Sequence, residues 1–131
     1  MNKNLINFLI SLRNASLSKK TTLKVKNVKA LANYAAILYQ EGFIQSYIVT
    51  KKDKITGEQF LIINLRSFED KVMTENIHLL STPSKMKILS CLELIQTNLK
   101  NKLIVLSTSK GIMSHRDCIK KKLGGVAVFS C

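Results

Sequence analysis

The sequence has few acidic residues, few cysteines and no long apolar run, and each shortage excludes a class of protein. Only 8 Asp and Glu residues stand against 21 Lys and Arg residues, which gives a formal net charge of +13. The 3 cysteines are odd in number and contain no Cys-x-x-Cys pair, which argues against a disulfide framework and a zinc site and favours a reducing compartment. No segment approaches the roughly 20 apolar residues of a membrane span. We therefore expect no metal, no cofactor and no membrane insertion.

Motifs of nucleotide-binding and hydrolytic enzymes are also missing. The chain contains no Gly-x-x-x-x-Gly-Lys and no Gly-x-Gly-x-x-Gly phosphate loop. The adjacent carboxylates Glu69 and Asp70 would point apart into solvent if they lie in a loop. Ser107 and Lys110 have the Ser-x-x-Lys spacing of penicillin-binding proteins, but that mechanism places the pair on the first turn of a helix. Because Gly111 follows at once and the companion motifs are missing, we expect no catalytic residues and no enzyme.

The positive charge is spread along the whole chain. Residues 1–70 carry 11 basic and 5 acidic residues, or +6, and residues 71–131 carry 10 and 3, or +7. A folded body with this charge suits a polyanion, because each ammonium near a phosphate releases condensed counterions. Only 3 of the 21 basic residues are Arg, so attraction between Lys and phosphate should outweigh bidentate recognition of guanine. Nucleic acid is the favoured partner, ahead of a merely solvated basic surface or a membrane surface.

Apolar periodicity predicts an α/β protein of the α+β type with two small lobes. Helices are expected at residues 4–15, 28–41, 92–99 and 114–124, and strands at residues 22–26, 43–50, 59–66, 76–80, 87–89, 103–106 and 126–129. The charged turn at residues 51–57 would join two of the strands as an antiparallel hairpin. The polar segment 67–71 marks the boundary between an N-terminal lobe, residues 1–70, and a C-terminal lobe, residues 71–131. The lobes should pack tightly, each with a short mixed or antiparallel sheet and helices.

Two of the expected helices in the C-terminal lobe carry specific signals. Leu92, Ile95 and Leu99 recur at helical spacing and would line one face of the first. Ser114 begins a Ser-x-x-Asp pattern with Asp117, a variant of the capping box that opens a helix. Both signals place helices beside the apolar strands of this lobe.

The apolar cluster at the start of the chain could be mistaken for a signal peptide. Asn7 and Ser11 interrupt it, no small-residue cleavage site follows, and it leads directly into Arg13. A core-facing helix is the better interpretation. The absence of an Arg-rich, Ser-rich presequence suggests synthesis in the compartment where the protein works, and the bias toward Lys, Asn, Ile and Leu suits an AT-rich genome.

Three hydroxyl groups and a cation are clustered at residues 107–111. Ser107-Thr108-Ser109-Lys110-Gly111 follows a buried-type strand and precedes the capped helix. Hydroxyls exchange hydrogen bonds with ribose 2′-hydroxyls and base edges in the wide minor groove of RNA, and a lysine neutralises phosphate. Taken alone, the same residues are also typical of a turn that bonds its own backbone. Both interpretations remain open on these residues alone.

The segment resembles the signature of the bacterial-type small-subunit ribosomal protein eight family. The similarity covers STSKGIMSHR at residues 107–116 and LGG at residues 123–125, before a short apolar strand. Upstream, LRN at residues 12–14 looks like the end of the family's first helix, and EGFI at residues 41–44 like the end of its second. The resemblance covers nearly the whole chain and is weaker between residues 49 and 106.

The resemblance implies a structural protein that binds the central domain of small-subunit ribosomal RNA early in assembly, mainly through its C-terminal lobe. It implies the following RNA-binding residues: Ser107, Thr108, Ser109, Lys110, Gly124, Gly125, Arg13, Asn14 and Lys29, with Lys85 and Lys87 keeping charge nearby. The hydroxyl loop would enter an RNA minor groove, and the glycine pair would let the backbone approach RNA closely. Neighbouring small-subunit ribosomal proteins are further implied partners, and no small-molecule substrate is implied.

The resemblance also places the protein on a ribosome, with the mitochondrial matrix favoured over the bacterial cytoplasm or a plastid. Two positions depart from the family's pattern. Members carry an acid after the glycine pair, where this chain has Val126, and an Arg-Ile-Tyr-like run where it has Met86, Lys87 and Ile88. Because the aromatic is missing, we expect weaker or more electrostatic RNA binding than in a typical member. A non-ribosomal RNA-binding or message-binding regulatory module is the alternative function.

Overall fold

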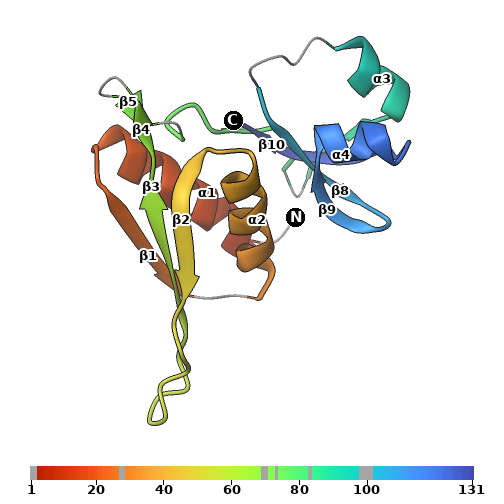
Figure 1. The fold of residues 1–131 in the computed structure, drawn as a ribbon. Helices are drawn as coiled ribbons and strands as arrows, with labels where there is room; N and C mark the ends of the chain where they lie inside the picture. The colour runs from red at the N-terminus through yellow and green to blue at the C-terminus, as the bar shows by residue number, and fades with distance from the viewer. Residues whose placement is uncertain (1–2, 27–28, 69–70, 73, 83, 98–101) are drawn as a thin grey trace. The chain divides into compact units, whose positions relative to one another are not determined.

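The chain folds into helices and antiparallel strands in a computed structural model that describes residues 3–26, 29–68, 71–72, 74–82, 84–97 and 102–131 (Figure 1). Two compact units are formed, one by residues 3–76 and the other by residues 77–131. Each unit has its own antiparallel sheet and its own helices, so the predicted α+β class is confirmed. No helix among the described residues has the length and apolar character needed to cross a membrane.

The N-terminal unit is a three-stranded sheet with two helices. Its helices are α1 (Lys3–Leu17) and α2 (Lys29–Gln40), and its strands are β1 (Thr22–Lys26), β2 (Ile44–Val49) and β3 (Phe60–Leu65), in the order β1-β3-β2. Burial alternates along β3, where Leu61 and Ile63 are fully buried and Ile62 is not. This period of two shows that one face of the sheet is more deeply buried than the other, and α1 and α2 lie against one side of the sheet (Figure 1). The expected β2–β3 hairpin is confirmed.

The end of the N-terminal unit differs from the expected boundary after residue 70. A short hairpin follows β3, formed by β4 (Ser67–Phe68) and β5 (Lys71–Val72). Val72 is buried, and the buried hydroxyls of Thr74 and Ser16 are hydrogen-bonded to each other. These contacts attach the segment to α1, so the N-terminal unit extends to Asn76.

The C-terminal unit is organised around its last strand. Its strands are β6 (His78–Leu79), β7 (Lys87–Leu89), β8 (Ile104–Thr108), β9 (Gly111–Ser114) and β10 (Gly125–Ser130). β10 pairs with β8 along one edge and with both β6 and β7 along the other, and β9 pairs with β8. The core includes Leu94 of α3 (Cys91–Gln96) and Cys118 of α4 (His115–Lys120), packed with Leu106 and Ala127 of the sheet.

Two helix expectations in this unit need correction. Leu92 and Ile95 are exposed by 69% and 57%, whereas Leu94 is buried, and Leu99 lies outside the described residues. A capping box at Ser90 starts the helix: the Ser90 hydroxyl accepts from the Glu93 amide while the Glu93 carboxylate accepts from the Ser90 amide. The packing of Leu94 against the core of the sheet then decides which side of the helix faces inward.

The second correction concerns the end of α4. Ser114 is its N-cap, as expected, and accepts from the Asp117 amide at 3.4 Å. The helix ends at Lys120 rather than extending to residue 124, and Lys122 adopts a positive φ of 55°. A residue in the left-handed region ends a helix, and it leads the chain into β10.

Candidate nucleic-acid interface

The Ser-Thr-Ser-Lys segment forms the turn of the β8–β9 hairpin. Thr108 pairs with Gly111 across the two strands, so Ser109 and Lys110 are the turn residues. The Thr108 hydroxyl donates to the Gly111 carbonyl at 2.7 Å and accepts from the Lys110 amide at 3.3 Å. Thr108 therefore stabilises the turn. The hairpin presents three exposed side chains to solvent, those of Ser107, Ser109 and Lys110.

The hairpin geometry also bears on the Ser-x-x-Lys spacing. The rejected hydrolase mechanism would need Ser107 and Lys110 on the first turn of a helix. Ser107 instead lies in β8, and Lys110 lies in the turn that follows the strand. The pair is exposed to solvent, which is suited to binding an external polyanion.

The glycine pair packs tightly against backbone of the same unit. A Cβ added to Gly125 would lie 2.3 Å from the Ser107 carbonyl oxygen and 3.0 Å from Cγ2 of Thr108. A Cβ added to Gly124 would lie 2.8 Å from the Leu89 carbonyl oxygen. Separations this short are not tolerated between real atoms, so both positions require glycine. The glycines thus allow β10 to approach β8 and β7 closely, a role that the sequence alone did not reveal.

Lys87 lies on β7, along the edge of β10 opposite to β8. It pairs with Ala127, and its amide donates to the buried Ser81 hydroxyl at 2.9 Å. Ser81 in turn donates to the Ala127 carbonyl, so one hydroxyl joins β7 to β10. Lys85 is exposed and pairs with Thr82 in an isolated bridge. Pro83, which follows Thr82, lies outside the described residues.

The two departures from the family's pattern are direct neighbours. Val126 pairs with Ile88 on one side and with Ser107 on the other, and Ser107 pairs with Ile112. Directly opposite residues share a face of a sheet, so these four side chains form a row across β7, β10, β8 and β9. Ile88 is 70% exposed. The Ser107 hydroxyl is therefore flanked by apolar side chains on an accessible face.

The structure brings most of the expected C-terminal contact residues onto one sheet. Ser107, the glycine pair and Lys87 come from three neighbouring strands or their immediate ends. The expected N-terminal positions lie elsewhere in the chain, with Arg13 and Asn14 exposed on α1 and Lys29 exposed at the start of α2. These three residues remain predictions from the resemblance.

Two of the cysteines and one histidine lie in or beside the core of the C-terminal unit. Among the described residues, no cluster of three His, Cys, Asp or Glu side chains could hold a metal. Burial, reinforced by Asp117, raises the pKa of the Cys118 thiol, and burial raises the pKa of Cys131 to about 12. Neutral thiols are poor nucleophiles and ligands. His115 is buried, and its Nδ1 accepts from the Ile104 amide at 3.2 Å.

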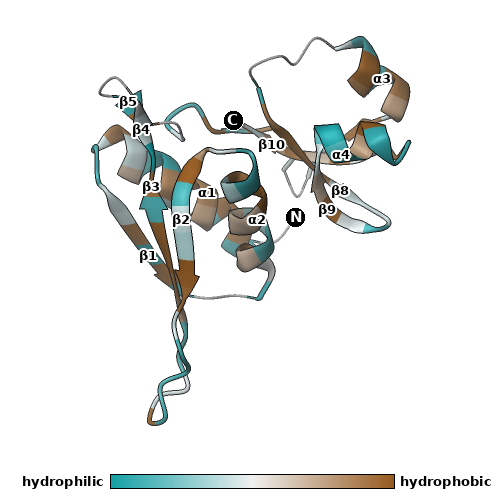
Figure 2. Ribbon diagram, viewed as in Figure 1, coloured by the Kyte–Doolittle hydropathy of each residue, from teal (hydrophilic) through white to brown (hydrophobic). Residues whose placement is uncertain are grey.

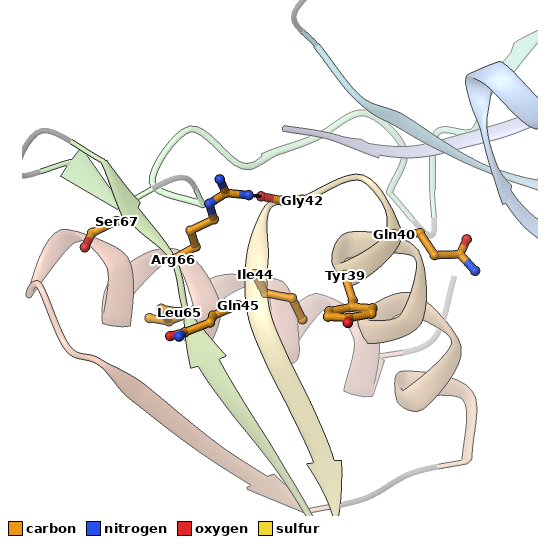
Figure 3. Close-up of a pocket in the computed structure, with 8 residues that line it drawn as sticks. All are labelled: Tyr39, Gln40, Gly42, Ile44, Gln45, Leu65, Arg66 and Ser67. Atoms are coloured by element: carbon orange, nitrogen blue, oxygen red, sulfur yellow. Dashed lines mark hydrogen bonds between the residues drawn. The ribbon is translucent and has the colours of Figure 1, made fainter.

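A shallow cavity of about 580 Å³ lies in the N-terminal unit beside the end of α2 (Figure 3). The buried side chains of Ile44 and Leu65 contribute to its lining, together with Arg66. The Arg66 guanidinium donates to the Gly42 carbonyl at 3.1 Å (Figure 3). Gly42 has a φ of +80°, as expected for the residue that ends a helix. Arg66 therefore supports the turn between α2 and β2.

Comparisons with known proteins show which family the chain belongs to. The family model for ribosomal protein S8 matches residues 3–130. The chain is 36% identical to small ribosomal subunit protein uS8c of Marchantia polymorpha over 127 residues, which cover 95% of this chain and 93% of that protein. It is 30% identical to small ribosomal subunit protein uS8 of Marinomonas sp. (strain MWYL1) over 130 residues, which cover 98% and 95%. With a match over nearly its whole length, the chain belongs to the ribosomal protein S8 family.

Proposed function

We propose that this protein is a structural constituent of the small ribosomal subunit and binds the central domain of small-subunit ribosomal RNA directly. The observation that carries the proposal is the β8–β9 turn, which presents Ser107, Ser109 and Lys110 to solvent. Hydroxyls exchange hydrogen bonds with 2′-hydroxyls and base edges of a minor groove, and Lys110 neutralises phosphate. The protein stabilises folded RNA during assembly and is not an enzyme.

The rigidity of the hairpin supports this role. The Thr108 hydroxyl bridges the turn, and the close approach of Gly125 holds β10 against β8 directly below it. A turn that is already ordered loses little conformational freedom when it binds, which favours affinity. The net charge of +13 adds a salt-dependent attraction to phosphates. Neighbouring small-subunit proteins are the further partners that we propose.

The proposal is tested by measuring salt-dependent binding of the purified protein to a central-domain ribosomal RNA fragment, with a scrambled hairpin as competitor. A Ser107→Ala, Ser109→Ala double variant should bind the fragment roughly ten- to one hundredfold more weakly, because each lost hydrogen bond contributes about 0.5–1.5 kcal/mol. A Ser18→Ala, Ser67→Ala variant, which removes two exposed hydroxyls of the N-terminal unit, should bind normally. The proposal would fail if the protein bound both RNAs with equal affinity and the Ser107→Ala, Ser109→Ala variant bound them equally well. The protein would then bind RNA only through its general positive charge.

Two finer points of the proposal have their own tests. A message-binding regulatory role is the alternative, and it predicts that a messenger RNA fragment competes with the ribosomal fragment at similar concentration.

For the compartment, we propose the mitochondrial matrix, because the bias of the chain toward Lys, Asn, Ile and Leu suits an AT-rich genome. A plastid and the bacterial cytoplasm are the alternatives. The relatives named above are a uS8c protein and a bacterial uS8 protein. Immunodetection of the protein in purified organelle ribosomes distinguishes these locations.

A further inference from the structure

The connection between β2 and β3 is a projecting hairpin rather than a tight turn. Residues 51–58, here called the basic arm, extend away from the end of the three-stranded sheet (Figure 1). At the base of the arm, the Thr50 amide donates to the Phe60 carbonyl at 2.9 Å and the Phe60 amide donates to the Thr50 hydroxyl at 2.9 Å. The arm is therefore a continuation of the strand pair and is held by it.

Hydrogen bonds within the arm fix the shape of its tip. The Asp53 amide donates to the Glu58 carbonyl at 3.0 Å, and the Gly57 amide donates to the Asp53 carbonyl at 2.8 Å. The Asp53 carboxylate accepts from the Ile55 amide at 3.0 Å, which is an Asx-turn. Gly57 has a φ of +70°, which suits glycine. These bonds order the tip without any help from the core.

The charges of the arm leave an excess of lysine at its surface. Lys51, Lys52 and Lys54 are exposed, and they make no ion pair with the residues that the structure describes. Of the two acids, Glu58 is paired with Lys26 at 3.3 Å, and Asp53 is engaged with the Ile55 amide. The arm therefore presents three ammonium groups against two carboxylates, and one of these carboxylates, Glu58, is paired with Lys26 of β1.

The tip also presents an apolar side chain. Ile55 is 94% exposed, and Figure 2 shows the arm as hydrophilic with a hydrophobic point at its end. Burial of such a side chain against a partner is favourable by about 25 cal/mol per Å² of apolar surface. An exposed apolar residue surrounded by cations suits a surface that combines phosphates with apolar sugar and base faces.

We propose that the basic arm is a second RNA-binding element, with Lys51, Lys52 and Lys54 on phosphates and Ile55 against the sugar or base faces of the same RNA segment. The proposal rests on the proposed function, since it assumes a ribosomal RNA partner. The three lysines favour RNA over an apolar pocket on a protein as the partner of the arm, because docking of a lone Ile would not require three cations beside it. The arm also gives a function to the positive charge of residues 1–70. These residues carry +6, and the β8–β9 turn lies outside them.

The experiment compares two triple variants of equal net charge on complete small-subunit ribosomal RNA. Lys51→Gln, Lys52→Gln, Lys54→Gln should reduce the slope of log affinity against log salt by about 2 to 3, since each lost phosphate contact contributes roughly 0.7 to 0.9. The matched control Lys20→Gln, Lys71→Gln, Lys102→Gln removes three exposed lysines outside the arm and should leave the slope close to that of the wild type. Equal changes in the two variants would overturn the proposal.

A second measurement identifies the partner of the tip. Replacement of Ile55 by the photoreactive residue p-benzoylphenylalanine should yield a crosslink to ribosomal RNA in assembled subunits. The crosslinked nucleotides should be ones that the Ser107→Ala, Ser109→Ala variant still protects, because the arm binds them independently of the β8–β9 turn. A crosslink to protein alone would overturn the proposal in favour of a protein-docking arm. If the wild type fails to prefer the central-domain fragment while Ile55 still crosslinks to ribosomal RNA in assembled subunits, recognition of the central domain fails and the arm proposal stands.

Discussion

Gly125 lies directly against the backbone of Ser107, where an added Cβ would be only 2.3 Å from the Ser107 carbonyl oxygen. The residue proposed to touch RNA is therefore held in place by the residue that follows α4 and begins β10. The proposed recognition of RNA and the folding of the sheet therefore depend on the same contact. The resemblance to known ribosomal proteins suggested only that a glycine would let backbone approach RNA, whereas the structure provides an intramolecular reason for it.

Gly125→Ala should destabilise the protein by about 1–3 kcal/mol, because the methyl group would push β10 away from β8. The measurement is the free energy of unfolding in urea. Gly57→Ala is the control, because a Cβ there would meet nothing within 4 Å and would suffer only from the positive φ. A Gly125→Ala variant no less stable than Gly57→Ala would show that β10 can shift without loss.

Ser81→Ala should cost about 2 kcal/mol and loosen β7. The buried Ser81 hydroxyl accepts from the Lys87 amide and donates to the Ala127 carbonyl, and a buried polar group left without its partner costs about 1–3 kcal/mol. Hydrogen exchange at the Lys87 amide should speed up in this variant. Ser84→Ala, at an exposed position, should leave that exchange rate unchanged.

Local pattern explains which parts of the fold could be predicted. The alternation in β1 and the charged turn between β2 and β3 are neighbour effects, and both elements appear where they were expected. The order of β6, β7 and β10 in the sheet depends on pairing between strands far apart in sequence, which periodicity does not specify. The inward face of α3 was misjudged because it depends on how the helix packs on the sheet, where Leu94 is the buried residue.

Ile88→Tyr should strengthen RNA binding about tenfold without loss of stability. The side chain at position 88 is 70% exposed and lies in the same row as Ser107, so a tyrosine there could stack on a base, which contributes about 1–3 kcal/mol. Affinity for the central-domain fragment is the measurement. Leu92→Tyr on α3, where Leu92 is exposed by 69%, is the control. An equal gain in both variants would contradict an RNA contact at position 88.

The wild type should lose stability above pH 9 relative to Cys131→Ser. Burial raises the pKa of Cys131 from 9.0 to about 12, so the folded state keeps the thiol proton while the unfolded chain releases it. The stabilisation is complete below pH 9 and is lost as the pH rises toward 12, by up to about 1.4 kcal/mol per pH unit. Urea unfolding of both proteins at pH 8 and pH 10 measures the difference. Parallel stability curves would show that this thiol is not protected by the fold.

The candidate site was predictable in its residues more than in its geometry. Residues 107–110 stand out because hydroxyls and a cation follow an apolar strand, and the structure places them in an accessible turn. The neighbourhood of Ile88, Val126 and Ser107 could not be read from the sequence, because it arises only when β10 lies between β7 and β8. The buried link made by Ser81 gave no signal, since a single serine in a polar segment usually faces water.

The position of β10 in the chain has a consequence for the order in which a newly synthesised protein matures. All strands of the N-terminal unit precede β6, so that unit can be completed while translation is still under way. β6, β7 and β8 instead wait for β10, which is the last strand in sequence and the hydrogen-bonding partner of all three. A nascent chain that stops before Gly125 would therefore lack the strand that joins β6, β7 and β8 into one sheet. Without β10, the β8–β9 hairpin would lose the backbone that packs against Ser107, so a copy truncated there would have the proposed RNA-binding turn without its supporting strand.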